Sequence, residues 1–271
     1  MTTPIAVTIA GSDSGGGAGI QADLKTFSAL GVYGASVIAA LTAQNTKGVT
    51  AIHDVPPDFV TAQIDAVFSD LDVGAVKIGM LSQPAVIKAV ASGLAHYKQS
   101  KIVLDPVMIA TSGDRLLAPE AIAVLRDVLM KQALIVTPNL PEAAALLETT
   151  IANTEAEMQA QGEKLLALGA RAVLIKGGHG GGAESVDILV EPNATARLAA
   201  ERIDTPNTHG TGCTLSSAIA AGLAKGLDLA DSVRQAKAYV TAAIAASNQI
   251  TIGHGHGPVH HFHHWWNEDR T

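Results

Sequence analysis

Short runs rich in valine and isoleucine alternate along this chain with longer amphipathic segments, and this rhythm limits the possible folds more than any other feature. The runs that predict strands are residues 5–10, 36–41, 75–78, 102–104, 134–137, 172–175 and 186–190. The segments that predict helices are residues 21–30, 58–71, 84–96, 119–131, 155–168 and 214–225. Such an alternation predicts a parallel sheet whose two faces are both covered by helices.

The composition favours the same class of fold. Hydrophobic residues make up 48% of the 271 residues, but aromatic residues only 3%. Aliphatic strands packed beneath alanine-rich helices would therefore form the core. A chain of this length can bury one large core, and no stretch has the composition of a linker. We expect an α/β protein with one domain over residues 1–271.

The charge balance and the single cysteine exclude several classes of protein. The formal net charge of -7 disfavours the clustered basic surface that binds nucleic acids. One cysteine cannot form a disulfide within the chain, and residues 1–20 lack the pattern of a secretory signal. No apolar stretch reaches the ~18 residues that a membrane helix needs. The sequence thus predicts a cytoplasmic protein without nucleic-acid or membrane partners.

The residues that follow five of the predicted strands are polar or glycine-rich. In chain order they are residues 11–19, Gly79-Met80, Asp105-Pro106-Val107, Pro138-Asn139 and Lys176-Gly177-Gly178. In open parallel sheets, ligands bind beyond the carboxyl ends of the strands. Because these ends share one edge of the sheet, we expect one site there.

The glycine cluster at residues 11–19 follows the first strand. It lacks both the G-x-G-x-x-G spacing of a dinucleotide-binding loop and the G-K-[ST] ending of a P-loop, which disfavours a dehydrogenase and a P-loop kinase. One interpretation is a mobile surface turn. The interpretation that we favour is backbone packed closely against a flat ligand.

A second glycine-rich loop, residues 207–213, leads into the helix predicted at 214–225. Gly210 and Gly212 let the backbone approach a ligand, and the first N–H groups of the helix offer a site for phosphate. The partial positive charge at the start of the helix also favours a thiolate. We therefore expect Cys213 to ionise more readily than a free cysteine and to act as a base near neutral pH. The alternative is that Cys213 is a small buried apolar residue and that the glycines only mark a helix start.

Two carboxylates stand at neighbouring strand ends. Asp105 directly follows an apolar strand, where burial of a carboxylate is costly without a partner, and it could orient a metal or a substrate. Glu142 lies in the segment 139–142, which opens a helix. It could satisfy the first amides of that helix, which is the more common role, or hold Mg²⁺ through water.

Lys176 ends a buried run and precedes Gly177-Gly178, so its ammonium group would stand at the sheet edge beside flexible backbone. It could bind a phosphate, or it could be an ordinary exposed lysine at a strand end.

Six of the ten histidines fall in residues 254–264. A tract of this kind can bind metal, but its spacing matches no zinc site and no cysteine or carboxylate is interleaved. We favour either a docked C-terminal segment or a mere affinity for transition metals.

Five motifs resemble those of the ribokinase superfamily, and within it the bacterial hydroxymethylpyrimidine/phosphomethylpyrimidine kinases of thiamine biosynthesis. They are residues 10–23, 42–46, 77–81, 104–108 and 208–213. The resemblance runs nearly end to end and implies a three-layer α/β/α ribokinase-like fold with a mainly parallel central sheet. In the wider superfamily an aspartate base ends the last motif, whereas Cys213 stands there in this chain, a departure typical of the pyrimidine kinases.

The resemblance also implies roles for single residues. The residues that it places around an aminopyrimidine substrate are Gln44, Gly11, Ala18, Asp23, Met80 and the backbone of Val107. The residues that it places around MgATP are Lys176, Asn139 and, as a weaker candidate, Lys237 for the nucleotide, Asp105 and Glu142 for Mg²⁺, and Gly210, Thr211 and Gly212 for the anion hole. A carboxamide such as that of Gln44 donates and accepts at once, which suits a ring nitrogen beside an exocyclic amine.

The function expected from this resemblance is two successive phosphoryl transfers from MgATP, to 4-amino-5-hydroxymethyl-2-methylpyrimidine and then to its monophosphate. Cys213 would take the alcohol proton in the first transfer, whereas the phosphate oxygen that attacks in the second needs no base. Pyridoxal or pyridoxine kinase activity is the nearest rival, because those substrates also carry a hydroxymethyl group on a flat nitrogen heterocycle. A non-catalytic ligand-sensing module is the alternative from another class. A homodimer is expected from the resemblance alone.

Overall fold

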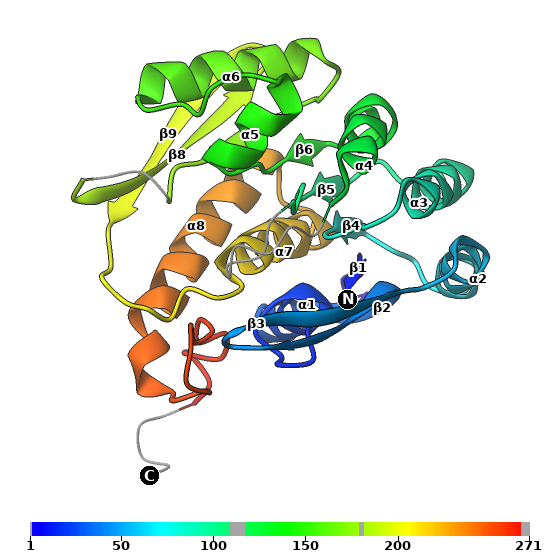
Figure 1. Cartoon of the computed structure of the whole chain (residues 1–271), viewed down its shortest axis with the longest axis horizontal. Helices are drawn as coiled ribbons and strands as arrows, with labels where there is room; N and C mark the ends of the chain where they lie inside the picture. Colours follow the sequence, from blue (N-terminus) through cyan, green and yellow to red (C-terminus); the bar gives the residue numbers. More distant parts are fainter. Residues whose placement is uncertain (1, 109–116, 179–181, 267–271) are drawn as a thin grey trace.

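The computed structural model describes residues 2–108, 117–178 and 182–266, and strands alternate with helices over most of them (Figure 1). The strands are β1 (Ile5–Gly11), β2 (Tyr33–Asn45), β3 (Gly48–Asp54), β4 (Ala75–Ile78), β5 (Ile102–Leu104), β6 (Ile135–Val136), β7 (Val173–Lys176), β8 (Glu184–Glu191) and β9 (Ala194–Glu201). The α-helices are α1 (Gly19–Ala29), α2 (Pro57–Phe68), α3 (Pro84–His96), α4 (Pro119–Val124), α5 (Leu140–Leu147), α6 (Glu155–Ala167), α7 (Thr211–Ala224) and α8 (Leu229–Ala245). The shorter helical turns are η1 (Leu125–Leu129), η2 (Met130–Gln132) and η3 (Ser247–Gln249).

All the described strands belong to one sheet, in the order β3-β2-β1-β4-β5-β6-β7-β8-β9. The strands from β2 to β7 are parallel to one another. At the edges, β3 pairs antiparallel with β2, and β8 and β9 form an antiparallel extension beside β7. The prediction of a mainly parallel sheet is confirmed.

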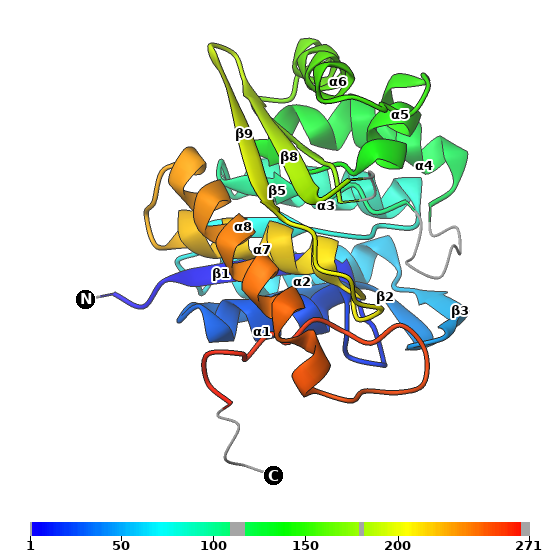
Figure 2. The ribbon, with the colours of Figure 1, turned by 90° about the vertical axis from the view of Figure 1, so that its left-hand side faces the viewer.

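Two apolar cores lie on opposite faces of the sheet, which gives the predicted three layers (Figures 1 and 2). Side chains alternate between the faces of a strand, so Val7 and Ile9 of β1 join one core while Ala6 joins the other. The first core packs against α2, α3 and α6, and the second against α1, α7 and α8. Both faces of the sheet are therefore covered, which leaves its edges for a ligand.

The strands β3 and β9 are absent from the sequence prediction, and both are edge strands. Most residues of both are exposed or half-buried, so neither has the buried apolar run that marks the central strands. In addition, β9 is rich in alanine, which has a low strand propensity. Pairing with β2 and β8 therefore decides these strands, because neither sequence has the buried apolar run by which the other strands were predicted.

The C-terminal residues dock in two stretches: 254–256 on Thr46 at the β2–β3 turn, and 260–265 on the helical face formed by α1, α7 and α8 (Figure 2). The Tyr239 hydroxyl donates to the carbonyl of His261 over 2.6 Å, and the Thr214 Oγ1 lies 3.1 Å from His261 Nε2. The His260 amide donates to the carbonyl of Ala243. The interpretation of the histidine-rich tail as a docked segment is confirmed. Among the described residues, no helix is both long and apolar enough to cross a membrane.

Candidate active site

A cavity of about 550 Å³ opens at the carboxyl edge of the parallel strands. All five strand ends that the sequence analysis singled out contribute to its wall, and their lining residues include Gly11, Met80, Asp105, Asn139 and Lys176. The loop that begins α7 adds Gly210, Thr211, Gly212 and Cys213. The strand ends that were predicted to share one sheet edge therefore surround one cavity.

Glycine is required where the two glycine-rich loops meet. Gly210 adopts a left-handed φ of 77°, and a Cβ there would lie 1.9 Å from the carbonyl oxygen of Gly17. At Gly11 an added Cβ would lie 2.6 Å from Cε of Met80, which is the flexible end of a side chain and can move aside. The loops therefore pack backbone against backbone beside the cavity, which favours closely packed backbone over a mobile surface turn for residues 11–19.

The residues expected around an aminopyrimidine divide into two groups. Gly11, Ala18, Gln44, Met80 and Val107 all line the cavity. Asp23 does not lie among the lining residues, because its side chain is fully buried beneath them on α1. The structure therefore gathers five of the six residues around one space and places Asp23 in the layer below it.

A cluster of two carboxylates and one ammonium group lies at the other end of the cavity. Lys176 Nζ is 2.7 Å from Asp105 Oδ1 and 3.8 Å from Glu142 Oε2. Burial disfavours the charge of Asp105, but Lys176 and then Lys77 outweigh it, and the pKa of Asp105 is lowered. Burial likewise opposes the charge of Lys176, but Asp105 and Glu142 raise its pKa above the ordinary value. Lys176 is therefore a paired cation at the site, and its interpretation as an exposed lysine is wrong.

Glu142 forms the cap of α5 that its position suggested. Its Oε2 accepts from the backbone N–H of Asn139 over 2.7 Å, and the Asn139 side chain accepts from the Glu142 N–H over 2.8 Å. This reciprocal pair is a capping box. Burial first, and the nearby charge of Asp105, raise the pKa of Glu142 to about 7 despite Lys176. The capping role is confirmed, and it leaves the carboxylate at the edge of the cavity.

Cys213 lies in the first turn of α7, but the prediction that it ionises readily is wrong. Burial raises the pKa of its thiol to about 11, although the Lys77 ammonium and the backbone N–H of Gly19 favour the thiolate. The charges of Asp23 and Asp105 act in the same direction as burial. The helix terminus alone does not offset the loss of water and two nearby carboxylates.

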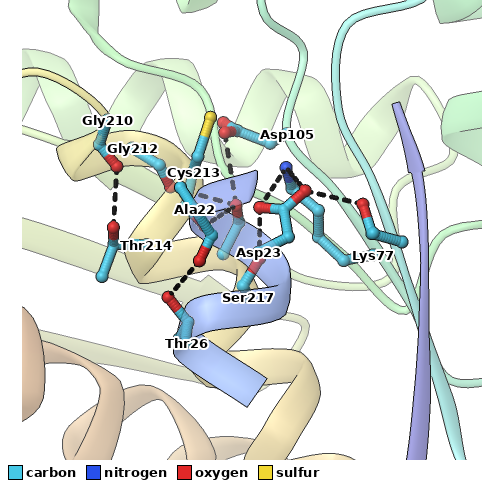
Figure 3. A network of polar contacts seen from close by, with 12 residues as sticks. Ala22, Asp23, Thr26, Lys77, Asp105, Gly210, Gly212, Cys213, Thr214 and Ser217 are labelled. Carbon is cyan, nitrogen blue, oxygen red and sulfur yellow. Dashed lines mark hydrogen bonds and ion pairs between the residues drawn. The ribbon is translucent and has the colours of Figure 1, made fainter. Parts of the chain in front are cut away.

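A buried ion pair beneath Cys213 has no counterpart in the sequence analysis. Lys77 on β4 and Asp23 on α1 are both fully inaccessible, and Lys77 Nζ lies 2.8 Å from each oxygen of the Asp23 carboxylate. Thr8 and Ser217 donate to the same carboxylate over 2.6 Å each. Figure 3 shows the pair packed between α1, α7 and β4. Burial opposes the Lys77 charge, but Asp23 outweighs it and raises the pKa of Lys77.

Lys237 on α8 reaches the cavity from the side of the antiparallel extension. Its Nζ lies 2.8 Å from Asp187 Oδ2 and 3.1 Å from the carbonyl of Ser185, both on β8. All three residues line the same cavity as Lys176. The structure therefore brings this weaker nucleotide candidate into the site, where it is already paired with a carboxylate.

His209 is a second lining residue that the sequence analysis did not single out. Its Nε2 lies 2.9 Å from Asp13 Oδ2 and 3.4 Å from Gln44 Nε2. Asp13 also accepts backbone N–H groups of Gly15, Gly17 and Ala18. One carboxylate thus joins both glycine-rich loops. Only the resemblance of the motif 208–213 pointed toward this position, because a lone histidine carries no signal of its own.

The same protein family is found by comparisons of sequence and of structure. The family model described as phosphomethylpyrimidine kinase matches residues 13–260. A hydroxymethylpyrimidine/phosphomethylpyrimidine kinase of Rhizobium meliloti is 61% identical over 98% of this chain and 100% of its own length. The crystal structure of a phosphomethylpyrimidine kinase from Clostridium difficile has a TM-score of 0.79 at 48% identity, over 89% of this chain and 99% of that chain.

A kinase with a different named substrate has the same fold. An ADP complex of Bacillus subtilis pyridoxal kinase superimposes with a TM-score of 0.91 at 36% identity, over 98% of this chain and 100% of that chain. The fold alone therefore does not distinguish pyrimidine from pyridoxal substrates. With the match of the family model and the full-length relative, this chain belongs to the phosphomethylpyrimidine kinase family and has its ribokinase-like fold.

Proposed function

We propose that this chain phosphorylates 4-amino-5-hydroxymethyl-2-methylpyrimidine and then its monophosphate, with ATP as the donor. The observation that carries the proposal is one cavity with two chemically distinct ends. Gln44 offers a donor and an acceptor for an aminopyrimidine at one end. Lys176 and the first turn of α7 offer positive charge for phosphate groups at the other. Cys213 lines the same cavity.

In the first transfer, the hydroxymethyl oxygen forms a bond to the γ-phosphorus while the bond from that phosphorus to the β–γ bridging oxygen breaks, and ADP leaves. The alcohol proton passes to the Cys213 Sγ in its thiolate form, which becomes a thiol. The first-turn amides of Gly212 and Cys213 have no partner further back in α7, so they can stabilise equatorial phosphoryl oxygens. Positioning and charge neutralisation supply most of the catalysis in such a transfer.

A thiol with a pKa of about 11 is a weak source of thiolate at pH 7. Roughly one molecule in 10⁴ then carries the thiolate. Among the nearby groups, Lys77 contributes most to stabilising that charge. We assign Lys77 as the residue that positions a positive charge beneath Cys213, held in place by Asp23.

The carboxylates of Asp105 and Glu142 fit a magnesium ion that arrives with ATP. Mg²⁺ in kinases commonly uses one or two carboxylates together with nucleotide phosphates and water. Among the described residues, no cluster of three or more histidine, cysteine or acidic side chains could hold a metal alone. When bound, Mg²⁺ would neutralise negative charge on the phosphates. Lys176 would keep the two carboxylates close together.

The second transfer uses a phosphate oxygen as the nucleophile. This group is largely deprotonated at pH 7, because the second pKa of a phosphate monoester is about 6. It therefore needs no proton acceptor from the protein. The two steps share Lys176 and the amides of α7 but differ in their need for Cys213.

The decisive assay follows ADP release from MgATP with the hydroxymethylpyrimidine and identifies the products by mass spectrometry. Successive appearance of the mono- and diphosphate supports the proposal. Turnover of pyridoxal but not of the pyrimidine would overturn it and move the substrate to the vitamin B6 class.

The homodimer and the cytoplasmic location suggested by the sequence remain proposals, and sedimentation of the purified protein tests the first.

Replacing Lys176 by methionine should lower kcat/KM for ATP by about 10²–10³-fold, because it removes a cation from the transferring phosphoryl group. Steady-state kinetics with a saturating second substrate measures the effect. Lys88→Met is the matched control, since Lys88 is exposed on α3, and it should behave like the wild type. An unchanged kcat/KM for Lys176→Met would remove Lys176 from the phosphate site.

A further inference from the structure

We propose that His209 fixes which end of the Gln44 carboxamide faces which neighbour, and thereby the direction in which the substrate ring binds. This assignment rests on the proposed aminopyrimidine substrate. It makes His209 a positioning residue for substrate specificity. The observations that carry it are the hydrogen-bond partners of His209, Asp13, Gln44 and Thr42.

The proton on His209 Nε2 follows from its partner. Burial disfavours the charge of Asp13, but the hydrogen bonds from His209 and from backbone N–H groups outweigh it and lower the pKa of Asp13. An ionised carboxylate only accepts hydrogen bonds. His209 Nε2, 2.9 Å from Asp13 Oδ2, must therefore carry a hydrogen and donate it. This nitrogen then has no free lone pair, so Gln44 can face it favourably only as a second acceptor of the same N–H.

The imidazole ring cannot easily turn away from this arrangement. The His209 N–H donates to the carbonyl of Gly257, and the Val259 N–H donates to the carbonyl of His209. The ring edge packs so closely on Gly17 that a Cβ there would lie 2.4 Å from His209 Cδ2. The docked C-terminal segment and the first glycine-rich loop thus hold the ring, and the Gln44 side chain is the partner that adjusts.

The Gln44 carboxamide can face His209 and Thr42 in two orientations, which are related by a 180° rotation. In the structure its Nε2 faces His209 Nε2 at 3.4 Å, and its Oε1 lies 3.1 Å from Thr42 Oγ1. Two N–H donors then face each other. The single Thr42 hydroxyl hydrogen is also shared with the carbonyl of Ser12, which lies closer at 2.8 Å.

The rotated carboxamide removes this contact between two donors. Its oxygen would share the His209 Nε2–H with Asp13 as a second acceptor, and its nitrogen would donate to the Thr42 oxygen, whose own hydrogen goes to Ser12. The remaining lone pair and the remaining N–H of Gln44 are then free for a ligand. The backbone of Gln44 does not need to move, because Ser14 Oγ holds both its N–H and its carbonyl at 2.8 Å.

The order of donor and acceptor on Gln44 decides how the aminopyrimidine lies. On this ring, the 4-amino donor is flanked by the N3 acceptor on one side and by the carbon with the hydroxymethyl group on the other. Exchanging the ends of the carboxamide turns the ring over and moves the hydroxymethyl group to the opposite side. Only one order can therefore direct the reacting oxygen toward Cys213.

The test compares His209→Met, which has no N–H donor, with His209→Gln, which keeps one at a similar distance from the backbone. His209→Met should raise KM for the aminopyrimidine about tenfold or more, as expected for losing a hydrogen bond in a network with a charged group. KM for ATP should stay near the wild-type value. His209→Gln should restore most of the loss. The same pair is then measured in a Gln44→Ala background and with 5-hydroxymethyl-2-methylpyrimidine, which lacks the 4-amino group.

If His209 acts through Gln44, the effect of His209→Met disappears in the Gln44→Ala background and with the analogue. An equal effect in all three settings would mean that His209 only supports the fold, and no effect in any would also overturn the assignment. Should His209→Met not fold, His209→Asn against His209→Gln gives the same comparison, because asparagine is one carbon too short to reach Gln44. Failure of the wild type to phosphorylate the pyrimidine would instead refute the proposed function.

Discussion

Replacing Cys213 by alanine should slow phosphorylation of the hydroxymethylpyrimidine by about 10²–10⁴-fold, the usual contribution of a proton acceptor. Phosphorylation of the monophosphate should fall by less than about tenfold, because its nucleophile is already ionised. Separate single-turnover assays with the alcohol and with the monophosphate measure the two effects. The second transfer serves as the internal control for folding and for ATP binding. Equal losses in both would make Cys213 a positioning residue.

The raised pKa of Cys213 adds a pH dependence to this prediction. If the thiolate is the active form, kcat/KM for the alcohol should increase about tenfold per pH unit from pH 7 toward the pKa of about 11. The second transfer should change little over the same range. Cys213→Ala should abolish the slope of the first transfer along with most of its rate. A flat profile in the wild type would refute a thiolate base.

Replacing Asp23 by leucine should reduce the free energy of unfolding by about 3–5 kcal/mol, because it leaves the Lys77 ammonium buried without its partner. Equilibrium denaturation in urea measures the change. The double variant Asp23→Leu/Lys77→Met should recover much of this stability, since it removes both buried charges. It should still lose activity in the first transfer, because the Lys77 charge, the largest one that favours the Cys213 thiolate, is then absent. Asp70→Asn, at an exposed position, should shift stability by less than about 0.5 kcal/mol.

The pKa of Lys77 decides how the contribution of this ion pair to the free energy of unfolding changes with pH. Its pKa is higher in the folded protein than its ordinary value of 10.5. A group of this kind contributes its full stability below the unfolded pKa and loses it as the pH rises through the folded pKa. The contribution of this pair to the stability of the wild type should therefore be the same at pH 7 and pH 9. A wild-type stability that falls between these values by the full contribution of the pair would show that Lys77 is neutral in the fold.

The buried Lys77–Asp23 pair is a contact that the local sequence does not predict. Lys77 is preceded by Ala75 and Val76 and looks in sequence like a polar interruption of a strand. Only the approach of α1 brings Asp23 within 2.8 Å of it and makes its burial tolerable. Burial first, and then the charges of Asp23 and Asp105, raise the pKa of Cys213 and reverse the expectation drawn from its helix terminus. A pKa depends on all charges within a few ångströms, and local sequence specifies few of them.

The sequence by itself determined the alternation of strands and helices, the class of fold and the edge of the sheet that carries the site. It could do so because periodicity, glycine and helix-capping residues act over a few neighbouring positions. Tertiary structure alone decided the Lys77–Asp23 pair, the contact of His209 with Asp13 and Gln44, and the docking of the histidine-rich tail on α7 and α8. These contacts join residues far apart in the chain, so they form only when packing against the sheet brings distant helices and loops together.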